Sequence, residues 1–213
     1  MACVKVFWEN PYLTTLQAIV TYVNGDEVTL NRTIIYAFSG GQQSDSGTIK
    51  GLPVLNAKKV DHEIYYTLQN DHGLHVGDQV ELSIDWEKRY KLMRLHFAAE
   101  LVLELVYQKY GHPEKMGANI TEEKARIDFH WVGNIAMIFP DLLQSIEDLV
   151  ARNMEIVSAF SDATHEIRYW EIEGFAKVPC GGTHIKRTGE IGTIKLKRNN
   201  IGGGKERIEI LLT

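Results

Sequence analysis

The stretch from Trp86 to Tyr110 constrains the fold most, because it contains neither glycine nor proline and keeps one hydrophobic period throughout. Large apolar side chains recur at spacings of three and four residues: Trp86, Tyr90, Met93, Phe97, Leu101 and Leu105. This period places them on one face of an α-helix. Asp85 is a suitable N-cap before the stretch, and Gly111 is a suitable stop after it. The sequence therefore predicts one long amphipathic helix here.

The residues before this helix predict strands and turns. Short runs rich in β-branched and aromatic residues alternate with turn residues, as in Val4–Trp8, Leu16–Val23 and Glu27–Leu30. Between the last two runs, Asn24-Gly25-Asp26 is typical of a tight hairpin turn. We therefore expect residues 1–85 to form a compact β-barrel-like domain.

The residues after Asp85 mix helices and strands. Pro140 suits the first turn of a second helix, because its fixed φ is compatible with that position. Strand-like runs lie between and after the helices: Ala125–Trp131, Glu155–Phe160, Ile167–Ile172, Ile191–Leu196 and Arg207–Leu212. The predicted fold class is α+β, with a second domain over residues 86–213.

Composition and cysteine content indicate the cellular compartment in which the chain is expected to work. No window approaches the roughly 18 uninterrupted apolar residues that a membrane span needs, so no membrane partner is expected. The first residues lack the charged-then-apolar layout of a secretory signal. The two cysteines, Cys3 and Cys180, do not make a disulfide framework. We expect a reduced, cytoplasmic protein.

The charge is acidic overall but basic toward the C-terminal end. The formal net charge of −5 argues against a generic polyanion-binding protein. From Lys186 onward, however, basic residues outnumber acidic ones by seven to three. A basic end on an acidic body indicates local contact with phosphates, whereas lysines that only protect strand edges would give the same pattern. Charge alone leaves both interpretations open.

A glycine turn is the first place where chemistry can be expected. Gly40 and Gly41 allow the backbone to pass close to a ligand or to take a positive φ. Gln42 and Asp45 supply polar atoms beside them. By spacing alone, a plain structural turn explains these residues equally well.

A histidine–glutamate pair and a cysteine–histidine pair are the other two candidates. His96 and Glu100 lie four residues apart in the predicted helix, so they share one face and can hold a metal or a water. Cys180 and His184 flank residues 181–183, which include two glycines. Thiolate and imidazole are the donors that zinc favours, so the four residues together make a possible zinc site. For the helix pair, a core-edge histidine paired with a glutamate is the simpler alternative.

The glycine run at residues 202–204 is only superficially like a phosphate-binding P-loop. A P-loop has four residues between its glycines and Ser or Thr after its lysine, whereas Glu206 follows Lys205 here. We expect a glycine hairpin between two strands, whose amides can still contact a phosphate.

The order of these motifs resembles the alanyl-tRNA editing proteins (the AlaX family), which are free-standing relatives of the editing domain of alanyl-tRNA synthetase. The residues that carry the resemblance are Gly40–Gln42, the helix with His96, Cys180–His184 and Ile201–Ile208. The similarity spans nearly the whole chain and is especially close from Arg168 to Gly192. A glycine-rich N-terminal unit without a long tail is similar to the medium-length members.

The resemblance implies an aminoacyl-tRNA hydrolase that cleaves the ester between serine or glycine and the terminal adenosine of alanine tRNA. It implies one Zn²⁺ per chain, because the family's ligand positions fall on His96, Cys180 and His184. Substrate binding is expected at Gly40, Gly41, Gln42, Asp45 and Thr183. The acceptor end of the tRNA is expected to contact Gly203, Gly204, Lys205 and Arg207.

One position departs from the family pattern, since Glu100 stands where a second helix histidine is expected. A carboxylate can bind zinc at about 2.0–2.2 Å, but it lowers the charge and the softness of the site. Glu100 is therefore predicted to be either a fourth ligand or a general base for the attacking water.

Other functions stay open at this point. Glu100 keeps open a metal-free, non-catalytic tRNA-binding protein, and a hydrolase of another aminoacyl-tRNA has the same motifs. A Gly-Gly-Gln tripeptide also occurs in peptide-chain release factors. The Cys-Gly-Gly-Thr-His motif and the scarcity of basic residues around Gln42 argue against that class.

Overall fold

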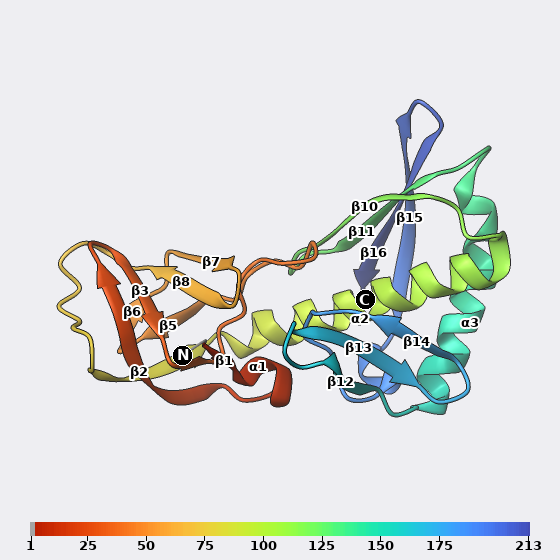
Figure 1. Cartoon of the computed structure of the whole chain (residues 1–213). Coiled ribbons are helices and arrows are strands. Elements are labelled where there is room, and N and C mark those ends of the chain that lie inside the picture. Colours follow the sequence, from red (N-terminus) through yellow and green to blue (C-terminus); the bar gives the residue numbers. More distant parts are fainter. Residues whose placement is uncertain (1–2) are drawn as a thin grey trace. The chain divides into compact units, whose positions relative to one another are not determined.

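The computed structural model describes residues 3–213, and its contacts divide the chain into two compact units. Unit 1 contains the residues up to Ser39 together with Gln43–Tyr90, and unit 2 contains Gly40–Gln42 together with Lys91–Thr213. Helix α2 (Trp86–Tyr110) begins in unit 1 and continues in unit 2 (Figure 1). A domain boundary between residues 85 and 86 stays a prediction.

Unit 1 is built around a curled seven-stranded sheet (Figure 1), as expected for a barrel-like domain. The strand order is β6-β5-β9-β2-β3-β8-β7. The bounds are β2 (Thr15–Asn24), β3 (Glu27–Leu30), β5 (Gly47–Ile49), β6 (Leu52–Pro53), β7 (Asn56–Val60), β8 (Glu63–Thr67) and β9 (Gln79–Ile84). Strand β2 connects the two halves, because its first half pairs with β9 and its second half with β3. The predicted hairpin between β2 and β3 is confirmed, with Gly25 at a φ of 61°.

Smaller elements complete unit 1. Strands β1 (Val4–Lys5) and β4 (Arg32–Thr33) form a short parallel pair. Helix α1 (Val6–Glu9) follows β1 directly, so the predicted strand at Val4–Trp8 is confirmed only for its first two residues. The Phe7 side chain is buried in the core of the unit.

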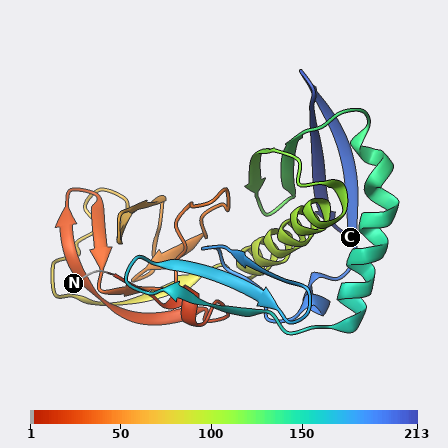
Figure 2. The ribbon, with the colours of Figure 1, turned by 45° about the vertical axis from the view of Figure 1, so that its right-hand side comes forward.

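Unit 2 places the rest of α2 between two antiparallel sheets (Figures 1 and 2). The four-stranded sheet has the order β10-β11-β16-β15, and the three-stranded sheet has the order β12-β13-β14. The bounds are β10 (Lys115–Ile120), β11 (Ala125–His130), β12 (Val157–Asp162), β13 (Ile167–Ile172), β14 (Ala176–Pro179), β15 (Ile194–Gly202) and β16 (Lys205–Leu212). Helix α3 (Phe139–Arg152) and the 3-10 helix η1 (Ile135–Ile138) contact the four-stranded sheet, and α3 also contacts the 3-10 helix η2 (Thr188–Ile191).

The helix predictions are confirmed, with one difference. Helix α3 begins at Phe139, so Pro140 lies in its first turn as expected. Helix α2 has its predicted limits, but Leu95–Ala99 are all buried, and five consecutive residues cover every side of a helix. This part of α2 is therefore buried all around rather than amphipathic, because sheets cover it on two sides.

The fold class is α+β, as predicted. No helix formed by the described residues is both long and apolar enough to cross a membrane.

Candidate functional site

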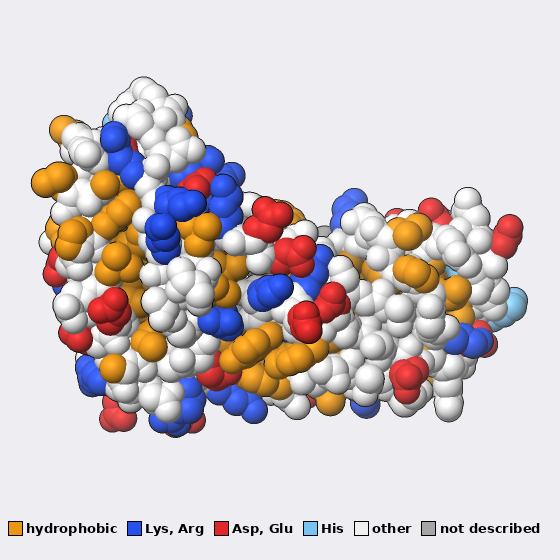
Figure 3. Space-filling view, turned by 180° about the vertical axis from the view of Figure 1, so that it is seen from behind, with side chains coloured by type: hydrophobic (Ala, Val, Ile, Leu, Met, Phe, Trp, Pro, Cys, Tyr) orange, Lys and Arg blue, Asp and Glu red, His pale blue; other side chains and the backbone are white. Residues whose placement is uncertain are grey.

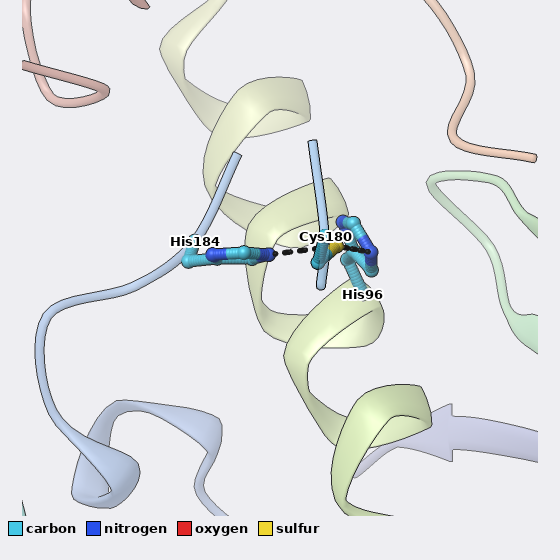
Figure 4. A group of neighbouring side chains, drawn as sticks. All are labelled: His96, Cys180 and His184. Atoms are coloured by element: carbon cyan, nitrogen blue, oxygen red, sulfur yellow. Dashed lines mark hydrogen bonds between the residues drawn. The ribbon is translucent and has the colours of Figure 1, made fainter. Parts of the chain in front are cut away.

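Three side chains far apart in the sequence converge in unit 2. His96 lies on α2, Cys180 directly follows β14, and His184 is on the loop beyond it. The Nε2 atoms of His96 and His184 lie 3.5 and 3.3 Å from the Cys180 sulfur (Figure 4). The ligand atoms of all three residues lie within 4.8 Å of one another. We call these three residues the His–Cys–His cluster.

The chain between Cys180 and His184 passes directly against the His96 ring. A Cβ atom on Gly182 would lie 1.9 Å from Cε1 of His96, a distance that no side chain can tolerate. Gly181, by contrast, has open space where its Cβ would be. One glycine of this pair is therefore required by close approach, and the other is not.

Gln42 determines which nitrogen of His96 carries hydrogen. Its side-chain Oε1 lies 2.7 Å from His96 Nδ1 and also accepts the backbone N–H of Thr183 at 3.1 Å. Its Nε2 donates to Thr183 Oγ1 at 2.8 Å, which fixes the orientation of the amide. Since Oε1 has no hydrogen to give, His96 Nδ1 must be the donor. The Nε2 atom of His96 therefore faces Cys180 and is available to a ligand.

Two glycines bring Gln42 to this position. Gly40 and Gly41 have φ angles of 60° and 88°, and a Cβ on Gly41 would lie 2.7 Å from the Ala118 carbonyl oxygen. The Gly41 carbonyl accepts the N–H of Ile120 at 2.8 Å, so the turn is fastened to β10. The glycine turn and the His–Cys–His cluster, separate in the sequence, thus form one site through Gln42.

Glu100 also reaches the cluster. Its Oε2 accepts a hydrogen bond from the indole N–H of Trp170 at 2.9 Å. Its Oε1 lies 3.4 Å from His96 Nε2 and 3.7 Å from the Cys180 sulfur. One carboxylate oxygen is therefore held by the protein, and the other is directed at the cluster.

The ionised forms of these residues stabilise one another. Burial opposes the charge on His96, yet the Cys180 thiolate and the Glu100 carboxylate raise its pKa to about 10. Burial also opposes ionisation of Cys180, but His96 and His184 lower the pKa of the thiol to about 6. Burial of Glu100 is likewise outweighed, because His96 and Trp170 lower the pKa of its carboxyl to about 2. At neutral pH the protein groups therefore place two anions beside an imidazolium, and a metal cation can take the place of the His96 proton at Nε2.

This donor set fits a zinc ion. Two imidazole nitrogens and one thiolate are donors that zinc prefers, and Glu100 Oε1 is placed to be a fourth. Outer hydrogen bonds typically orient ligating imidazoles. Here Gln42 holds Nδ1 of His96, and Ser158 Oγ lies 2.9 Å from Nδ1 of His184.

Asp45 lies in unit 1, and its carboxylate is fully engaged there. Arg89 donates to both of its oxygens, at 2.8 Å from Nε to Oδ1. The backbone N–H of Tyr36 also donates to Oδ2, at 2.6 Å. Both side chains of the Arg89–Asp45 pair are fully buried, which is the arrangement of a structural ion pair. The predicted role of Asp45 in substrate binding finds no support in these contacts.

The residues expected to contact tRNA lie on the β15–β16 hairpin. Gly203 and Gly204 form its turn with φ angles of 61° and 73°. Lys205 is exposed. Arg207 is half-buried and donates from Nε to Asp128 Oδ1 at 2.6 Å. The two glycines thus adopt the positive φ angles that this turn requires. Lys205 is open to solvent, whereas Arg207 is partly occupied by Asp128.

Sequence reasoning missed two residues of the site, Ser158 and Trp170. They are direct partners on adjacent strands β12 and β13, where Ser158 contacts His184 and Trp170 contacts Glu100. Alternation along a strand indicates that one face turns inward. Only the pairing register shows that these two residues meet the cluster.

The chain is similar to known proteins over nearly its whole length. The family model described as the threonyl and alanyl tRNA synthetase second additional domain matches residues 167–209. The alanyl-tRNA editing protein AlaX-M of Pyrococcus horikoshii is 34% identical over 212 residues, which cover 98% of this chain and 97% of that protein. AlaX-M of Methanosarcina barkeri is 31% identical, over 97% of this chain and 98% of that protein. The alanine–tRNA ligase of Methanococcus maripaludis is 30% identical over 96% of this chain, which corresponds to 25% of the ligase.

Proposed function

The chain belongs to the family of alanyl-tRNA editing proteins, and from this we propose that it hydrolyses the ester of alanine tRNA wrongly charged with serine or glycine. In this reaction the bond between the aminoacyl carbonyl carbon and the ribose oxygen breaks. Water supplies OH to the carbonyl carbon and a proton to the ribose oxygen. The partner is the acceptor end of the tRNA, and the setting is the cytoplasm, where charged tRNA is used.

The observation that supports this proposal best is the His–Cys–His cluster and its link to Gln42. The residues that would hold one Zn²⁺ per chain are His96, Cys180 and His184. A zinc ion held by them supplies a Lewis acid, which polarises an ester carbonyl or acidifies a water. Gln42 accepts the Nδ1 hydrogen of His96, so Nε2, on the side of Cys180, is the nitrogen whose proton the metal would replace.

Glu100 acts in this scheme by orienting a water molecule or by completing the ligand set. Its Oε1 faces the cluster, while Trp170 restrains Oε2. A hydrogen bond from Trp170 fixes one carboxylate oxygen, and the other lies on the side of His96 and Cys180. These contacts suit either predicted role, a fourth ligand or a base for the attacking water.

Substrate selection is assigned to Thr183 and Gln42. Thr183 is buried, and its hydroxyl oxygen accepts from Gln42 Nε2. The Thr183 hydroxyl hydrogen is then directed away from Gln42 and can be donated to a polar substrate group. Gly40 and Gly41 contribute by holding Gln42 on β10.

The proposal is tested by following ester loss from alanine tRNA charged with serine, glycine or alanine. Wild-type protein is expected to deacylate the seryl and glycyl esters faster than the alanyl ester. The Cys180→Ser variant is expected to lose both the zinc, measured by elemental analysis, and the activity. The Cys3→Ser variant is the matched control, because Cys3 is the other free cysteine and lies in unit 1.

The departure from the family pattern at Glu100 is the reason to test a second candidate, a tRNA-binding protein that lacks both metal and catalysis. Wild-type protein without zinc or hydrolysis, but with tRNA binding, would establish that candidate. A hydrolase of another aminoacyl-tRNA is distinguished in the same assay by threonine tRNA charged with serine, since the matching family model is named for both the threonyl and the alanyl tRNA synthetases.

A further inference from the structure

The outward face of the four-stranded sheet carries positive charge that the proposed site does not use. Side chains alternate along its strands, so Ile127, Ile208 and Leu196 are buried while their neighbours point outward. Six cations lie on the outward side: Lys124, Arg126, Lys195, Lys197, Lys205 and Arg207. We call this the cationic sheet face. Figure 3 shows Lys and Arg side chains gathered over this part of the molecule.

Only part of this charge is neutralised by the protein. Asp128 is shared by Arg126 and Arg207. Glu209 accepts from Lys124 at 2.7 Å. On strands β11, β15 and β16 themselves, the outward cations are Arg126, Lys195, Lys197, Lys205 and Arg207, and the outward anions are Asp128 and Glu209, a balance of 5 − 2 = +3 on a chain whose net charge is −5. Glu114 lies at the margin of the face, 3.7 Å from His130.

Three lysines make up the free part of this charge. Lys195, Lys197 and Lys205 are exposed, and in the described part of the chain, residues 3–213, they form no ion pair. Exposed lysines without acidic partners remain available to phosphates.

Protection of a sheet edge does not explain the whole face. Strand β15 is an edge strand, so Lys195 and Lys197 lie where lysine discourages pairing with another sheet. Lys205 and Arg207 lie on β16, however, and Arg126 lies on β11, and both strands are internal. An internal strand has no free edge, so edge protection does not account for its outward cations.

The cationic sheet face and the His–Cys–His cluster belong to the same compact unit. The sheet begins at β10, whose Ile120 donates to the Gly41 carbonyl. Gln42, the next residue, contacts His96. An RNA held on this sheet is therefore held by the unit that carries the proposed chemistry.

We propose that the cationic sheet face binds the phosphate backbone of the tRNA acceptor stem, an inference that rests on the proposed function. Phosphate contacts by lysine and arginine position a nucleic acid without reading its sequence. An A-form stem is recognised mainly through its backbone, because side chains cannot read its deep, narrow major groove. A sheet face with separated, exposed lysines suits that kind of contact.

The test is the salt dependence of binding to uncharged alanine tRNA. In the Lys195→Gln, Lys197→Gln, Lys205→Gln triple variant, Kd should rise most at low salt, where electrostatic attraction contributes most. The slope of log Kd against log salt concentration should fall by about 2–3, at about 0.7–0.9 for each phosphate that the variant no longer neutralises. The control is a second triple variant outside the sheet, Lys50→Gln, Lys58→Gln, Lys91→Gln, with the same change in net charge and an expected wild-type slope.

A small substrate separates docking from chemistry. Hydrolysis of the seryl ester of a CCA trinucleotide should be unchanged in a Lys195→Gln, Lys197→Gln double variant, since this substrate lacks the stem and neither lysine is assigned to the acceptor end. An unchanged slope in the sheet variant, or an equal flattening in the control, would overturn the inference. The binding arm needs no hydrolysis, so a wild-type protein that binds tRNA through this face without deacylating it would refute the proposed function alone.

Discussion

At the scale of single residues, Glu100 is where the chain departs from the pattern expected of its family. Trp170 shows how the fold accommodates the departure. Its indole N–H is hydrogen-bonded to Glu100 Oε2, and the Trp170 side chain is fully buried. The orientation of the carboxylate is therefore determined by a residue on β13 rather than by α2 alone.

We predict that Trp170→Phe lowers kcat and leaves zinc content unchanged. Phenylalanine keeps an aromatic ring next to Phe97, whose ring centre lies 5.2 Å from that of Trp170, but it removes the N–H. A hydrogen bond to a charged group contributes about 1.5–3 kcal/mol, which corresponds to roughly a 10- to 150-fold loss in rate. The measurement is single-turnover deacylation of seryl-tRNA, with elemental analysis of the same samples.

Trp131→Phe provides the control for this substitution. Trp131 is half-buried and packs edge-on against Tyr110, outside the cluster. Its variant should deacylate at the wild-type rate. A wild-type rate for Trp170→Phe as well would show that Glu100 needs no indole partner.

At the scale of elements, the loop from Cys180 to His184 is shaped by its second glycine. Gly182→Ala should lose both zinc and activity, because the new methyl group would overlap the His96 ring. Gly181→Ala should keep both, since nothing lies within 4 Å of its Cβ position. Zinc content and deacylation measured on the two variants check this pair. Equal zinc content in both would mean that the loop can move away from His96 at little cost.

The β15–β16 hairpin has its own internal anchor on the buried face of the sheet. Glu206 is buried and accepts hydrogen bonds from Arg198 Nε and Nη2, both at 2.6 Å, and from Asn200 at 2.8 Å. The hydrogen bonds from Arg198 lower the pKa of Glu206 below its usual 4.5, although burial opposes this. The hairpin is thus held by a charge that persists at neutral pH.

This anchor predicts a pH-dependent stability difference. Because the folded pKa is depressed, the stabilisation is complete above the ordinary pKa of glutamate and is lost as pH falls through the folded value. Glu206→Gln should reduce the free energy of unfolding by about 1–2 kcal/mol at pH 7, after allowance for solvent screening at Arg198. The deficit should shrink on acidification to pH 3. Urea unfolding of wild type and variant at both pH values measures this difference in the free energy of unfolding. Glu123→Gln is the control, because Glu123 is exposed. A constant deficit would assign the effect to packing instead.

At the scale of the whole molecule, the two units have different kinds of buried charge. In unit 2 the His–Cys–His cluster brings buried ionisable side chains together, with Glu100 beside them. Unit 1 buries the Arg89–Asp45 pair, whose guanidinium also donates to the carbonyl oxygens of Pro11 and Ile34. The first arrangement is open to a ligand, whereas the second is satisfied entirely by the protein.

Asp45→Asn should therefore lower the free energy of unfolding by about 3–5 kcal/mol, because it leaves the Arg89 charge buried without its carboxylate. Zinc content should not change, since His96, Cys180 and His184 all belong to unit 2. Adding Arg89→Met to the variant should cost less than the sum of the two single changes. Urea unfolding of the single and double variants measures these terms. A stable Asp45→Asn protein with a raised KM would instead support the role in substrate binding that the sequence suggests.

Local sequence determined much of this protein. The long helix, the hairpin at Gly25 and the α+β class follow from hydrophobic period and turn chemistry, which act over a few residues. The Cys180–His184 motif likewise has its donors close enough in the chain to be recognised together.

Only the tertiary structure decided which residues that are distant in the sequence contact one another. It buried the Leu95–Ala99 part of α2 on all sides, enclosed Asp45 with Arg89, and joined Gln42 to His96. It also brought Trp170 to Glu100, a contact between residues 70 positions apart. Such contacts depend on the pairing register of the strands and on which faces of the elements pack together. Neither can be predicted from the residues that are neighbours in the sequence. The sequence could thus identify the donors of the site, but only the packing of β10, β12 and β13 around α2 could show what holds them.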